Sequence, residues 1–127
     1  MKLKLVIFEP HPEDIRQAKI LFTQSQDYYR KGAYFEAEGL LKEAITIYPF
    51  LAPVNLMLGK IYLIRGSAIR DPILMENARM MFEMAKALEP NSKESEMLLE
   101  LFQYEDLIRQ WHILPLRISV FHMATTA

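Results

Sequence analysis

The sequence predicts an all-α protein, a stack of helical hairpins. Three observations on the 127-residue chain lead to this prediction. Shifting the sequence by 34 positions aligns one group of small, aromatic and turn residues, and shifting it by 41 positions aligns a second group. Self-similarity at such a period is typical of helical repeat architectures. Between these landmarks the apolar residues recur every three to four positions, as on one face of an α-helix.

The first hairpin is expected over residues 15–51. Its first helix begins at Ile15 and ends just before Gly32, because glycine commonly follows the last turn of a helix. Its second helix begins at Tyr34 and is ended by Pro49, whose ring disfavours helical backbone at the residue before it. The segment therefore predicts two helices joined by a tight turn.

The second hairpin is expected over residues 52–92. The seven-residue difference between the two shifts indicates that it contains an insertion. Its first helix is predicted over residues 53–66, opened by a proline. The insertion is predicted to be partly an extra helical turn and partly a mobile surface loop at residues 66–70. Asp71 stands before a proline, which is a typical helix start. The second helix of this hairpin is therefore expected over residues 72–88.

A fifth helix, the capping helix of the stack, is expected over residues 93–110. Asn91 and Ser92 can cap its first turn. It has Glu100 and Gln103 where the preceding repeat has a glycine and a tyrosine. A terminal helix with one polar face is what a repeat stack needs to remain soluble.

The two flanks differ from the repeats. Residues 2–8 of the first flank (1–14) and residues 116–122 of the second flank (111–127) are rich in Val, Ile, Leu and Phe, with partial alternation of apolar and polar side chains. Both flanks are candidates for short strands. The alternative is that they are disordered tails.

The aligned residues resemble the tetratricopeptide repeat signature at its proper spacing. The matching positions are Tyr28, Gly32, Tyr34, Ala37, Leu41, Ala44 and Pro49, followed by Leu58, Gly59, Tyr62, Gly66, Ala78, Phe82, Ala85 and Pro90. The chain departs from the signature at Gln24, Ser25 and Asn55 and in the insertion. The resemblance implies a right-handed superhelical stack of helical hairpins, two repeats plus a capping helix, in which small residues allow close helix contacts. Tyr28, Tyr62, Leu41 and Phe82 are expected to fill the space between the helices.

Composition and motifs argue against catalysis and against most ligands. The chain has no cysteine and a formal net charge of −1, so thiolate chemistry and attraction to nucleic acid are not expected. His11, His112 and His122 have no partner at metal-ligand spacing, and no glycine-rich phosphate loop is present. No apolar stretch approaches the roughly 20 residues that span a bilayer. We therefore expect a single cytoplasmic domain, residues 1–127, without enzymatic activity, metal, cofactor or membrane span.

The resemblance also implies a binding surface. In tetratricopeptide folds the first helix of each pair lines a concave face, the usual ligand groove. Helix geometry places ten residues of this chain there: Lys19, Phe22, Gln26, Tyr29, Leu56, Lys60, Leu63, Met97, Leu101 and Tyr104. Because most of them are apolar, we expect a scaffold or adaptor that binds an apolar or amphipathic segment of another protein.

Two questions remain open at the level of sequence. A homodimer formed through the apolar flanks, or through an exposed end of the stack, is the alternative function. Met75, Met80, Met81 and Met84 crowd one predicted helix. Such flexible side chains either fill an irregular core, the favoured interpretation, or form an adaptable binding surface.

Overall fold

The computed structural model describes residues 11–110, with side chains described as far as residue 103. Within that range the backbone forms five α-helices and no strand. The helices are α1 (Pro12–Arg30), α2 (Tyr34–Ile47), α3 (Ala52–Ile69), α4 (Pro72–Leu88) and α5 (Lys93–Gln110). The all-α prediction is confirmed for the described residues. The short strands predicted within the two flanks lie outside them, whereas residues 12–14 of the first flank are described and form the start of α1.

The first hairpin follows the sequence prediction except at its start. Helix α1 begins at Pro12, three residues before the predicted start at Ile15. Proline is well suited to the first position of a helix. The negative carboxylates of Glu13 and Asp14 stabilise the helix start through their attraction to the positive end of its dipole. Gly32 has a φ angle of 79° in the turn between α1 and α2. The glycine allows this left-handed conformation at little cost.

The predicted loop at residues 66–70 is wrong. Helix α3 continues through Gly66 to Ile69, and Arg70 takes the left-handed conformation that ends it, with a φ angle of 54°. Gly66 is buried against α4, since an added Cβ atom would lie 3.0 Å from the Cβ atom of Leu74. Gly66 therefore allows α3 and α4 to approach closely. The sequence does not distinguish a glycine in such a contact from a glycine in a turn.

The extra residues of the second hairpin lengthen its helices. Helix α3 extends five residues beyond the position equivalent to the last residue of α1, and α4 begins three residues before the position equivalent to the start of α2. The connection between α3 and α4 is one residue shorter than that between α1 and α2. The insertion therefore adds paired helix surface instead of loop.

The predicted caps of the last two helices are largely confirmed. The Asp71 side chain accepts hydrogen bonds from the backbone amides of Ile73 and Leu74, at 2.9 and 3.4 Å. At α5 the hydroxyl of Ser92 accepts a hydrogen bond of 3.2 Å from the amide of Ser95. These bonds satisfy amides that a helix start leaves without intrahelical partners.

The core consists mainly of small residues facing large ones. The alanines of the repeat signature are fully buried, as predicted: Ala37, Ala44, Ala78 and Ala85. Leu41, Tyr62 and Phe82 are buried among them. Tyr28 is not, because 39% of its surface is exposed and the amine of Lys31 lies 5.9 Å from its ring centre. The prediction that Tyr28 fills the space between helices is therefore wrong.

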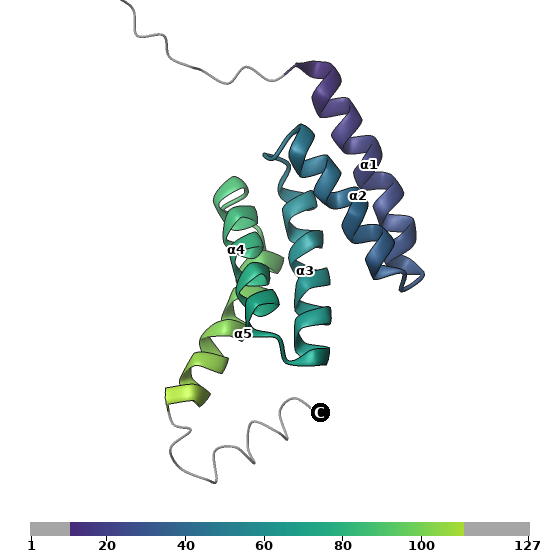
Figure 1. Cartoon of the computed structure of the whole chain (residues 1–127). Coiled ribbons are helices and arrows are strands. Elements are labelled where there is room, and N and C mark those ends of the chain that lie inside the picture. The colour runs from purple at the N-terminus through teal and green to yellow at the C-terminus, as the bar shows by residue number, and fades with distance from the viewer. Residues whose placement is uncertain (1–10, 111–127) are drawn as a thin grey trace, which may run out of the picture.

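The hairpins stack side by side, with α3 lying between α2 and α4 (Figure 1). Packing is extensive within each hairpin and smaller between α2 and α3. The α2–α3 junction contains a polar cluster, in which the buried carboxylate of Glu38 forms ion pairs with Arg65 and, at 2.8 Å, with Lys42. The hydrogen bond from Lys42 to Glu38 raises the pKa of the lysine, and burial raises the pKa of the Tyr62 phenol.

Candidate functional site

The structure places the predicted groove residues at the surface or partly buried, on α1, α3 and α5. Six are half-buried: Phe22, Gln26, Tyr29, Leu56, Lys60 and Leu63. Lys19 is exposed, as are Met97 and Leu101, which keep 63% and 53% of their surface accessible. The side chain of Tyr104 lies outside the described side chains. We call the nine described residues the α1–α3–α5 strip.

Part of the α1–α3–α5 strip lines a crevice between α1 and the start of α3. Its volume is about 300 Å³, and it brings together Lys19, Phe22 and Gln26. Four further residues complete the lining: Thr23, Leu51, Pro53 and Val54. We call this space the α1–α3 crevice.

The four additional lining residues were missed by the sequence prediction. Leu51 belongs to the connection between the hairpins. Thr23, Pro53 and Val54 are on α1 and α3 but are not among the residues predicted to face the groove. A signal was nevertheless present, because Pro53 follows Lys19 by the 34-residue repeat shift. Equivalent positions on successive first helices are neighbours in a stack of repeats.

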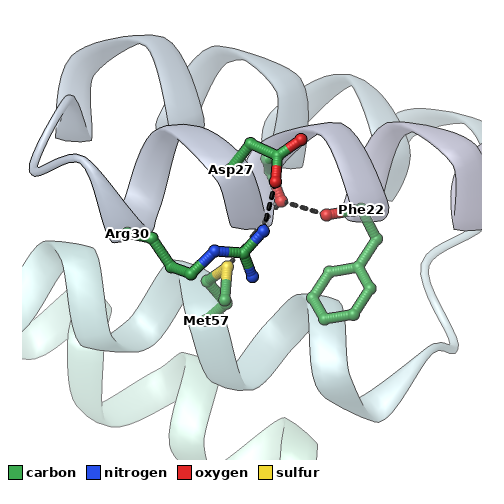
Figure 2. A network of polar contacts seen from close by, with 5 residues as sticks. Phe22, Asp27, Arg30 and Met57 are labelled. Atoms are coloured by element: carbon green, nitrogen blue, oxygen red, sulfur yellow. Dashed lines mark hydrogen bonds and ion pairs between the residues drawn. The ribbon is translucent and has the colours of Figure 1, made fainter.

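A buried serine, Ser25, lies on α1 where this helix packs against α3. The hydroxyl of Ser25 donates a hydrogen bond of 2.6 Å to the carbonyl oxygen of Phe22 and lies 3.7 Å from the sulfur of Met57 on α3. Figure 2 shows the Phe22 ring pointing away from α1 on the side where Met57 approaches, with the ion pair of Asp27 and Arg30 on the same helix. Ser25 stands where the repeat signature usually has glycine. It is accommodated because its hydroxyl donates its hydrogen bond within its own helix.

Asn55, which also departs from the repeat signature, forms hydrogen bonds at the start of α3. It is buried, and its side-chain nitrogen donates hydrogen bonds of 3.0 Å to the carbonyl oxygens of Pro49 and Leu51. These carbonyls belong to the connection between α2 and α3. Asn55 thereby positions Leu51, one wall of the α1–α3 crevice.

Ion pairs join α5 to both helices of the second hairpin. Lys60 on α3 pairs with Glu94, and Lys86 on α4 pairs with Glu96 at 3.5 Å. The Lys60 ammonium of the α1–α3–α5 strip is thus already neutralised by this chain. Lys19 forms no ion pair within the described residues.

The methionines of α4 divide between the two interpretations. Met75 and Met81 are half-buried and pack against the core. Met80 and Met84 are exposed, with 52% and 42% of their surface accessible. The interpretation of the methionines as core filling therefore holds for two of the four.

The described residues offer few groups for chemistry. Between residues 11 and 110, no group of three or more histidine, cysteine, aspartate or glutamate side chains could hold a metal ion. None of the helices described is long and apolar enough to cross a membrane. His112 and His122 lie outside the described residues. What the strip can do is bury apolar side chains of a partner and pair one exposed ammonium with an anion.

No family model matches the chain, and no curated protein matches its sequence. Among solved structures, 17 chains match. One is the first TPR of Spaghetti (RPAP3) bound to the HSP90 peptide SRMEEVD, with a TM-score of 0.40 and 18% sequence identity. The match covers 71% of this chain and 93% of that chain. The helical-hairpin arrangement described above is compatible with a tetratricopeptide-like fold.

Proposed function

We propose that the protein is a non-catalytic interaction module, a scaffold or adaptor that binds an apolar or amphipathic segment of a partner protein along the α1–α3–α5 strip. The observation that supports this most is the exposure of large apolar side chains on α5. Met97 and Leu101 lie four residues apart and face solvent, although the other exposed positions of α5 up to residue 103 are polar. Exposed apolar side chains gathered on one face are typical of binding surfaces.

The test uses a pair of polar substitutions on α5. Random dodecapeptides displayed on phage are selected on the full chain, and the dissociation constant of a selected peptide is measured by fluorescence anisotropy. Met97→Gln combined with Leu101→Gln should weaken binding at least about tenfold, because burying one large apolar side chain contributes roughly 1.5–3 kcal/mol and tenfold corresponds to about 1.4 kcal/mol. Both residues are exposed, so the thermal unfolding temperature should hardly change.

Phe22 and Leu63 are less suitable for this test. Both are partly buried and pack against the core, so polar replacements there would lower the stability of the fold together with any binding.

A matched control exists on α4. Met80→Gln combined with Met84→Gln changes two exposed apolar side chains at the same four-residue spacing, and it should leave the dissociation constant within about twofold of the original value, well under about 1 kcal/mol. Equal loss in both double variants, or failure to select any peptide, would refute the proposal.

Self-association is the second candidate function, and one observation favours it. Ile73, Met80 and Met84 form an exposed apolar line along α4, outside the α1–α3–α5 strip. End-to-end stacking through α5 is disfavoured, because Glu100 and Gln103 are exposed there. If the alternative is correct, light scattering shows a dimer that the α4 double variant converts to a monomer. A monomeric mass for the unmodified chain excludes it.

A further inference from the structure

The α1–α3 crevice combines an apolar interior with one uncompensated charge. Phe22, Leu51 and Val54 contribute apolar surface to its lining. Its volume of about 300 Å³ lies at the lower end of the range for ligand sites, which is large enough for an apolar side chain. The polar residues of its lining are Lys19, Thr23 and Gln26.

Lys19 is available to a ligand. It is exposed, and no ion pair within the described residues involves it. The nearest cation along α1 differs in this respect, because Arg16 forms an ion pair of 2.7 Å with Glu13. The Thr23 hydroxyl donates to the backbone carbonyl of Lys19 and leaves the ammonium untouched.

The equivalent junction between α3 and α5 is different. The 34-residue shift relates Gln26 to Lys60, and the 41-residue shift relates Pro53 to Glu94. Lys60 and Glu94 form an ion pair across the second junction, whereas Gln26 and Pro53 cannot form one across the first. Among the described residues, a carboxylate of this chain thus pairs with the lysine at the second junction, and none pairs with Lys19 at the first.

We propose that the α1–α3 crevice binds one aliphatic or aromatic side chain of the partner segment, and that Lys19 pairs with an aspartate or glutamate within one helical turn of that anchor. This inference rests on the proposed function and specifies the partner's chemistry. The apolar lining selects the anchor by burial. The long lysine stem lets the ammonium follow the ligand's carboxylate while the stem covers the apolar rim.

The two contributions differ in size. Burial of the anchor should dominate, with at least about a tenfold effect on the dissociation constant, or about 1.4 kcal/mol. The ion pair is exposed to solvent, and exposed pairs contribute little, so its effect should be about threefold to fivefold and should fall as salt is added. Binding that depended mainly on charge would contradict this ordering.

The first experiment blocks the crevice. Thr23→Trp places an indole at its wall, and Thr46→Trp on α2 is the matched control, because each threonine is exposed and donates to the carbonyl four residues before it. With dodecapeptides selected on the unmodified chain, Thr23→Trp should weaken binding at least about tenfold, about 1.4 kcal/mol, while Thr46→Trp should leave it nearly unchanged. Equal dissociation constants for the two variants would overturn the proposal.

The second experiment exchanges the charge. Lys19→Glu should weaken binding of peptides that carry an acidic residue next to the anchor and should strengthen binding of the same peptides with lysine at that position. Lys31→Glu changes the net charge equally, about 18 Å further along α1 at 1.5 Å per residue, and should do neither. Absence of acidic residues from the selected peptides, or no exchange of preference, would refute the role of Lys19.

Failure of this inference is distinguishable from failure of the proposed function. If Thr23→Trp has no effect but the double substitution at Met97 and Leu101 abolishes binding, the partner lies on the strip and the α1–α3 crevice is not its anchor site. If no peptide is selected at all, both proposals are refuted.

Discussion

Phe82→Ala is expected to lower the free energy of unfolding by about 3–5 kcal/mol. Phe82 is fully buried, and its ring centre lies 6.1 Å from that of Phe102 on α5. The same ring touches α3 at Gly59, so its removal would leave a cavity where three helices meet. Unfolding in urea, followed by circular dichroism, measures the change in free energy. A thermal scan should show a fall in melting temperature of roughly 10–20 °C.

Phe35→Ala is the control for this prediction. Phe35 lies at the start of α2 with 79% of its surface exposed, so the same truncation should change stability by less than about 0.5 kcal/mol. Similar losses in the two variants would contradict the assignment of Phe82 as the centre of the core.

Gly59→Ala is expected to destabilise the protein by about 2 kcal/mol, although alanine is the better helix former. An added Cβ atom at this position would lie 2.6 Å from the Cε1 atom of Phe82 and 3.1 Å from the Cβ atom of Met81. The ring cannot move away, because it is enclosed by the core. Overpacking of this kind costs up to about 3 kcal/mol, and the gain of about 1 kcal/mol in helix propensity offsets only part of it.

The opposite sign is expected for Gly39→Ala on α2. Beyond its chain neighbours and the nearby backbone of α2 itself, no atom lies within 4 Å of the Cβ atom that would be added there. Only the helix propensity therefore changes, and stability should rise by about 0.5–1 kcal/mol. Urea unfolding of both variants decides the matter. Two changes of the same sign would show that the α3–α4 contact is looser than the structure indicates.

The contacts that hold a hairpin together differ from those that hold hairpins to one another. Within a hairpin, small residues such as Gly59 and Ala78 let the helix axes approach and bury large side chains. Between hairpins, ion pairs contribute, as in Glu38 with Arg65 and Lys60 with Glu94. Because Lys60 of α3 pairs with Glu94 of the capping helix α5, Lys19 is the one lysine of the α1–α3–α5 strip without an ion pair within the described residues.

The helices themselves could be predicted from the sequence, because their signals are local. Periodic apolar residues, the caps at Asp71 and Ser92 and the left-handed turn at Gly32 each depend on a few neighbouring residues. The buried alanines could also be predicted, since their spacing repeats along the chain. These features established the all-α hairpin fold.

Only the tertiary structure decided what depends on residues far apart in the sequence. A glycine gives the same local signal whether it ends a helix or lies inside one against another helix. The sequence therefore predicts a loop at Gly66, whereas the structure places it inside α3, where an added Cβ atom would lie 3.0 Å from the Cβ atom of Leu74. The place of Tyr28 in the repeat predicts a core position, but the structure leaves 39% of its surface exposed. The α1–α3 crevice and the neutralisation of Lys60 by Glu94 depend on how successive hairpins approach one another, which is set by packing across the junctions and not by any local pattern.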